Sequence, residues 1–134
     1  MKSNVDLIIK DLKWLEERKT STDIKSISQV LNHLSILSAR FADEVTNAYK
    51  LQCELEDNYD IKFAKRFTEL TSSGTSAAAA KPMVEAELAE ERRDWTSAKV
   101  GYKKLDTFLD RIDKVLDSYR QAVSVQKQAD LKNV

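Results

Sequence analysis

Apolar residues recur every three or four positions along most of this chain, which is the spacing of one face of an α-helix. The first such stripe is short. The second is long and contains no glycine or proline, and the third continues almost to the last residue. The pattern therefore predicts an all-α protein with one short and two long helices. Their predicted extents are residues 1–20 for the short helix, 21–72 for the first long helix and 83–130 for the second.

The third stripe is the most regular, because it alternates steps of three and four residues and carries further apolar residues on one flank. Such a broadened coiled-coil repeat is typical of a bundle of three or more helices. A helix of about 50 residues would be roughly 75 Å long, which is too long to be buried within a chain of this size. We therefore predict an extended antiparallel hairpin that self-associates into a helical homo-oligomer. The predicted oligomerisation residues are Trp95, Tyr102, Leu105, Leu109, Ile112, Leu116, Tyr119 and Val123.

Residues 73–82 separate the two long stripes. Gly74 lies there among serines and threonines, which predicts a flexible linker, and Pro82 suits the first turn of the next helix. The four alanines at 77–80 could be helical or mobile, and the sequence does not decide between the two. With 134 residues, the chain has the size of a single helical domain, residues 1–134.

Composition supports long helices and an intracellular setting. Only two Gly and one Pro are present among 134 residues, so the residues that interrupt helices are scarce. The single Cys53 cannot form an internal disulfide, which suits a reducing compartment. No apolar run approaches the roughly 20 residues that span a membrane, and charges interrupt the first residues. We expect a cytoplasmic protein.

The residues that usually carry catalysis or bind metal are nearly absent. His33 is the only histidine, and Cys53 has no second cysteine to form a Cys-x-x-Cys motif. One His and one Cys do not make a usual zinc site, and no Glu-x-x-His motif offers a di-iron site. A glycine-rich phosphate loop is also missing from the sequence. We therefore predict no enzymatic activity, no metal and no cofactor.

The net charge is zero, but residues 61–67, near the end of the first long helix, form a local basic island. Cations that alternate with aromatic rings can bind phosphates while the rings stack on unpaired bases. The opposite interpretation stays open, because two phenylalanines four residues apart also suit a helix core, with the cations on the solvated face. The predicted DNA-binding residues are Lys62, Phe63, Lys65, Arg66 and Phe67.

The chain resembles the UvsY recombination mediator family of T-even phages. The resemblance lies in the order of helices and in Ala64-Lys65-Arg66-Phe67, which precedes Leu70 and Ser73-Gly74. Glu69 and Leu70 stand where that family has an aromatic pair. By this resemblance Lys65 and Arg66 would contact single-stranded DNA. The other implied partners are a RecA-like recombinase, a single-strand binding protein and further copies of the chain, in the cytoplasm of a phage host.

The leading prediction is therefore an oligomeric single-stranded DNA-binding recombination mediator that helps to load a RecA-like recombinase. The alternative is a non-enzymatic helical scaffold, or an assembly or chaperone protein of a phage, with no nucleic-acid binding. Such a protein would show the same apolar stripes and would need no basic island.

Overall fold

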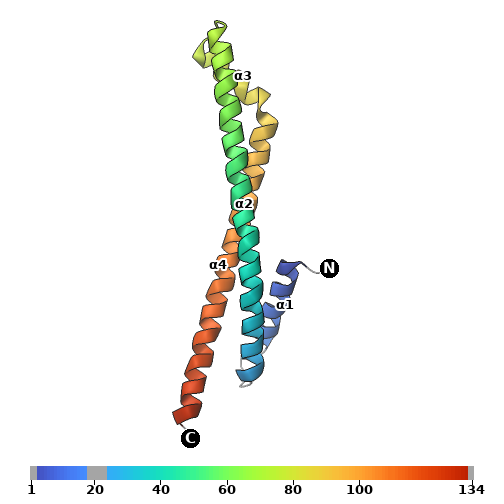
Figure 1. Cartoon of the computed structure of the whole chain (residues 1–134), viewed down its shortest axis with the longest axis vertical. Helices are drawn as coiled ribbons and strands as arrows, with labels where there is room; N and C mark the ends of the chain where they lie inside the picture. Colours follow the sequence, from blue (N-terminus) through green and yellow to red (C-terminus); the bar gives the residue numbers. More distant parts are fainter. Residues whose placement is uncertain (1–2, 18–23, 133–134) are drawn as a thin grey trace. The chain divides into compact units, whose positions relative to one another are not determined.

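The structure is a computed structural model that describes residues 3–17 and 24–132 (Figure 1). These residues form four helices and no strand, which confirms the all-α prediction. The boundary between the helices predicted over 1–20 and 21–72 lies outside the described residues. The helices are α1 (Asn4–Glu17), α2 (Ile24–Ser72), α3 (Ala77–Glu87) and α4 (Ala89–Lys132).

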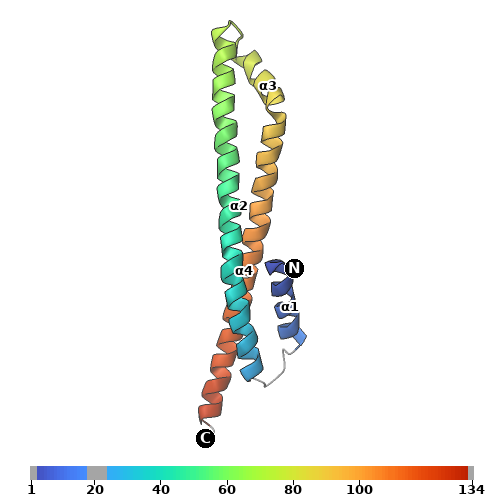
Figure 2. The ribbon, with the colours of Figure 1, turned by 45° about the vertical axis from the view of Figure 1, so that its right-hand side comes forward.

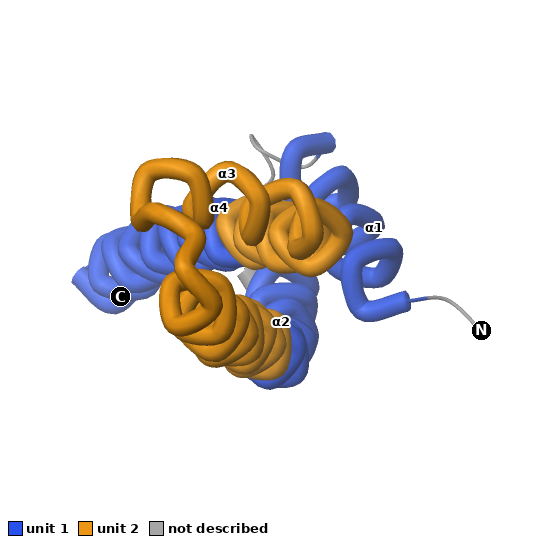
Figure 3. Tube along the Cα trace, turned by 90° about the horizontal axis from the view of Figure 1, so that it is seen from above, with its two compact units in different colours: residues 1–45, 106–134 blue, residues 46–105 orange. Residues whose placement is uncertain are grey.

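The chain divides into two compact units (Figure 3). Unit 1 comprises residues 1–45 and 106–134, and unit 2 comprises residues 46–105. The helices α2 and α4 continue from one unit into the other.

Unit 1 contains α1, the first part of α2 and the last part of α4. Figure 2 shows α1 beside α2, and the side chain of Asn4 donates a 2.8 Å hydrogen bond to Glu44. Between α2 and α4, the rings of Phe41 and Phe108 meet edge to face at 5.5 Å, and Ser38 donates a 3.1 Å hydrogen bond to Asp113. These two contacts show that the segments run antiparallel in this unit, because the earlier residue of α2 meets the later residue of α4. The fully buried side chains are Ile8, Leu15, Leu34, Leu37, Phe41 and Ile112.

Unit 2 contains the last part of α2, then α3 and the first part of α4. Its segments of α2 and α4 also run antiparallel, and aromatic pairs join them. Tyr49 lies 5.2 Å from Tyr102 between ring centroids, and Tyr59 stacks on Trp95 at 5.9 Å.

The turn between α2 and α3 is tightly specified. The amide of Thr75 bonds to the carbonyl of Leu70 and that of Gly74 to Thr71, which is a Schellman motif. Gly74 has φ of 101°, a conformation that residues with a Cβ rarely adopt. The hydroxyl of Ser76 then caps α3 by accepting a 3.2 Å hydrogen bond from the amide of Ala79.

The structure corrects the predicted linker over residues 73–82. The alanines at 77–80 are helical and begin α3, because Ser76 supplies an N-cap. Pro82 therefore lies inside α3 and not in a first turn. The interruption comes later, at Leu88, whose φ and ψ of −102° and 19° separate α3 from α4.

Candidate functional site

The predicted DNA-binding residues fall into two groups in unit 2. Phe63, Arg66 and Phe67 are half-buried, whereas Lys62 and Lys65 are exposed. The 3.6-residue repeat of α2 turns Lys65 away from Phe63 and Phe67. Lys62 lies one turn before Arg66, on the same side of the helix.

Arg66 is held by carboxylates of its own unit. Its guanidinium donates two hydrogen bonds to Glu87, of 2.8 Å and 3.2 Å, and a third of 3.3 Å to Glu69. This bidentate pairing fits the planar fork of arginine. Hydrogen bonding to Glu87 raises the pKa of Arg66, and the same contact lowers the pKa of Glu87. Arg66 therefore ties the end of α2 to the end of α3.

Phe63 and Phe67 stack on one another, with ring centroids 6.1 Å apart and planes within 12°. Both pack against the cluster of Leu70, Ala80 and Val84 that closes the turn. The two phenylalanines thus lie in an apolar cluster, as in the alternative that places them in a helix core.

The two lysines differ in their surroundings. The ammonium group of Lys62 lies 3.7 Å from a carboxylate oxygen of Glu91. Lys65 is exposed and forms no ion pair with any residue that the structure describes. Of the predicted basic island, Lys65 is thus the cation most available to an external anion.

The predicted oligomerisation residues of α4 contribute first to packing within the units. Ile112 and Leu116 are buried in unit 1, and the rings of Trp95 and Tyr102 pack on tyrosines of α2 in unit 2. All seam residues except Ile112 and Leu116 keep part of their surface exposed. The half-buried residues are Trp95, Tyr102, Leu105, Leu109, Tyr119 and Val123.

The residues considered for catalysis have structural partners. His33 bonds through Nδ1 to Asp11 of α1. Cys53 shares a hydrogen bond with Tyr49, and this bond raises the pKa of Tyr49 above its ordinary value. Within residues 3–17 and 24–132, His, Cys, Asp and Glu form no group of three or more that could hold a metal ion.

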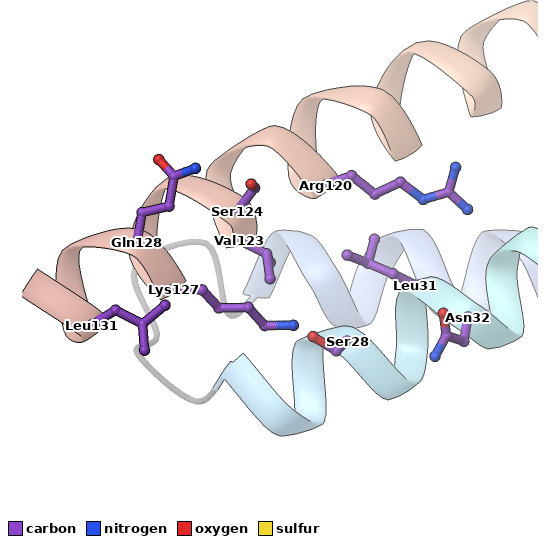
Figure 4. Close-up of a pocket in the computed structure, with 9 residues that line it drawn as sticks. All are labelled: Ser28, Leu31, Asn32, Arg120, Val123, Ser124, Lys127, Gln128 and Leu131. Atoms are coloured by element: carbon purple, nitrogen blue, oxygen red, sulfur yellow. The ribbon is translucent and has the colours of Figure 1, made fainter.

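Unit 1 contains a groove that the sequence analysis did not predict (Figure 4). It has a volume of about 390 Å³ and lies between the first turns of α2 and the last turns of α4. Helical periodicity put Leu31 and Val123 on apolar stripes, but it could not show that these stripes separate here. The described lining residues are Ser28, Leu31, Asn32, Arg120, Val123, Ser124, Lys127, Gln128 and Leu131.

Comparisons of the chain with protein-family models, with curated proteins and with solved structures gave no match. The resemblance to recombination mediators therefore rests on the sequence features given above. None of the described helices combines the length and the apolar character that crossing a membrane requires.

Proposed function

We propose that this protein is a helical scaffold, which assembles with other helices through apolar side chains that its own units leave exposed. The observation that carries this proposal is the incomplete covering of α4. Six of its eight predicted seam residues are only half-buried, and two further apolar residues in its last turns, Val125 and Leu131, are 66% and 76% exposed.

Single exposed apolar residues are common on protein surfaces and need no explanation. On α4, however, the half-buried residues recur at the spacing of one helix face, from Trp95 to Val123. A helix with such a stripe gains stability when another helix covers it. Self-association through this stripe is part of the proposal.

The proposal includes the extended hairpin predicted from the sequence. Its support is that α2 and α4 are each continuous over more than 40 residues, since they comprise 49 and 44 residues. Their segments also pair antiparallel within unit 1 and within unit 2.

Light scattering on the full chain tests self-association, over a range of about 1–100 µM. We expect a mass above that of the monomer. A Leu105→Glu variant, which alters the seam, should shift the mass toward the monomer. Val100→Glu is the matched control, because Val100 is an exposed residue of α4 outside the seam. Circular dichroism verifies that both variants stay helical, and a monomer at every concentration would contradict the proposal.

A second candidate function, the single-stranded DNA-binding mediator, is favoured by one observation. Lys65 is exposed without an ion pair among the described residues, and Lys62 is also exposed, 3.7 Å from Glu91. The other three residues of the predicted site have partners inside unit 2. In this candidate, Lys62 and Lys65 contact phosphates, and a RecA-like recombinase and a single-strand binding protein are the protein partners.

Titration of a labelled single-stranded oligonucleotide tests this candidate, at about 50 and 200 mM salt. Replacing both lysines in Lys62→Ala/Lys65→Ala removes two phosphate contacts, so the slope of log K against log salt should shrink by about 1.4. The control is Lys103→Ala/Lys104→Ala, which removes the same charge from exposed positions of α4. Absence of binding at the lower salt, or equal losses in both double variants, would exclude the mediator function at this site.

A further inference from the structure

The groove of unit 1 has an apolar floor and a polar rim. Leu31 of α2 is buried beneath it, while Val123 and Leu131 of α4 face it from the other side (Figure 4). Ser28, Asn32, Ser124 and Gln128 supply the uncharged polar groups.

On α4 the lining residues follow the repeat of a single helix face. They occur at positions 120, 123, 124, 127, 128 and 131, which is the spacing of residues that pack against a neighbouring helix. These positions cover three turns, about 16 Å along the axis. The shape of the groove therefore fits a helix lying beside α2 and α4 more closely than a compact small molecule.

The charge of the groove has one sign. Arg120 and Lys127 are its ionisable lining residues among those described, and no carboxylate accompanies them there. Arg120 donates a 2.9 Å hydrogen bond to the hydroxyl of Ser35, which holds its guanidinium at the rim and leaves other N–H groups for a ligand. The two cations are seven residues apart, so they lie two helical turns, about 10 Å, from each other.

This charge argues against a symmetric pair of copies as the occupant. A two-fold dimer on this face would place the same patch on both sides of the interface. Arg120 and Lys127 would then face the cations of the second copy, and like charges across an interface are unfavourable.

We propose that this groove binds an acidic amphipathic helix of a partner protein. Leucine-like side chains at three- and four-residue spacing would contact Leu31, Val123 and Leu131. Two carboxylates seven residues apart would pair with Arg120 and Lys127. This inference rests on the proposed scaffold function and specifies the chemistry of one of its partners.

Two synthetic helical peptides of about 20 residues serve as probes, which is long enough for measurable helix formation in water. They share one leucine seam and differ only in carrying a pair of Glu or a pair of Lys seven residues apart. Fluorescence anisotropy with the full chain should show saturable binding of the Glu peptide and roughly tenfold weaker binding of the Lys peptide.

Variants with matched controls locate the binding. Lys127→Glu should weaken binding of the Glu peptide about tenfold and strengthen binding of the Lys peptide. Lys132→Glu makes the same change outside the groove and should alter the affinity for either peptide less than about twofold. Leu131→Asp should weaken both peptides, and Val125→Asp should not, since Val125 is similarly exposed but does not line the groove. All four positions are exposed, so the variants should remain folded.

Equal affinity for the two peptides, no binding of either, or equal losses in Leu131→Asp and Val125→Asp would overturn the proposal. The proposal would also be overturned if the Glu peptide does not bind and Leu131→Asp has a lower light-scattering mass than the wild type. That result would mean that a second copy of the chain occupies the groove. Failure of the scaffold function itself is recognised separately, by a monomeric wild type and an unchanged mass in Leu105→Glu.

Discussion

The turn that joins α2 to α3 in unit 2 and the groove at the last turns of α4 in unit 1 both combine cations with apolar residues. In the turn, Arg66 has two carboxylate partners, and the apolar cluster is closed by Phe63 and Phe67. In the groove, the cations meet no described carboxylate among the lining residues, and Leu131 stays mostly exposed.

This difference shows why a basic and aromatic stretch of sequence is weak support for a binding site. Cations and rings stabilise a turn when the chain supplies acids and apolar neighbours, and they remain available to a ligand only when it does not. The cations near the end of α4 were not predicted as a binding site, yet they are the ones that meet no carboxylate among the described lining residues of the groove. The two regions therefore differ more in where their carboxylates lie than in where their lysines and arginines lie.

The largest expected effect comes from placing a carboxylate in the apolar cluster of the turn between α2 and α3, the closed region of this comparison. Val84 is 0% exposed within the cluster of the turn, so Val84→Asp should lower the free energy of unfolding by about 3–5 kcal/mol. The same change at the 66% exposed Val125 should stay within about 0.5 kcal/mol. Guanidinium unfolding followed by circular dichroism measures both. A loss below about 1 kcal/mol for Val84→Asp would show that the cluster does not close the turn.

A smaller pair of effects, of opposite sign, distinguishes the two glycines of unit 2. Gly74 ends α2 with a positive φ, so Gly74→Ala should cost about 1–2 kcal/mol through backbone strain alone, since a Cβ there meets nothing within 4 Å. Gly101 lies inside α4 with equally open space, so Gly101→Ala should stabilise by roughly 0.5–1 kcal/mol. Chemical unfolding measures both, and two changes of the same sign would contradict this account of the turn.

Much of the fold could be predicted from sequence because it depends on local patterns. The absence of Gly and Pro predicted a long helix over 21–72 and left open whether it is continuous through the polar Ser38 and Gln52. In the structure α2 runs without a break from Ile24 to Ser72. Gly74 likewise marked the turn. The break at Leu88 was not predicted because no glycine, proline or asparagine accompanies it. The start of α3 was not predicted because Pro82 also suits a first turn, whereas the N-cap in the structure is Ser76.

The candidate sites were less predictable because they depend on pairs of residues far apart in the chain. Glu69 was visible as an i+3 neighbour of Arg66, but Glu87 is 21 positions away and becomes its main partner only when α3 folds back on α2. The groove requires Leu31 and Leu131, separated by 100 positions, to line one space. Helical periodicity gives the face of each residue on its own helix and not the residue that it meets.

The smallest expected effect is the pH dependence of the closed region. Arg66 lowers the pKa of Glu87, so the ion pair stabilises the folded state fully above the pKa of an unfolded Glu, about 4.3, and this contribution is lost as pH falls through the lower folded value. Arg66, whose pKa is raised, stays charged throughout, so Glu87 is the member of this pair that changes charge in this window. Both side chains are partly exposed, and exposed ion pairs contribute little, so the change should be smaller than that in either glycine variant. Unfolding midpoints between about pH 2.5 and 6 measure it, and Glu87→Gln should remove this part of the slope while Lys65→Ala keeps it. An identical slope in wild type and Glu87→Gln would mean that the Arg66 pair does not hold the turn in solution, and the contrast with the groove would then rest on the apolar cluster alone.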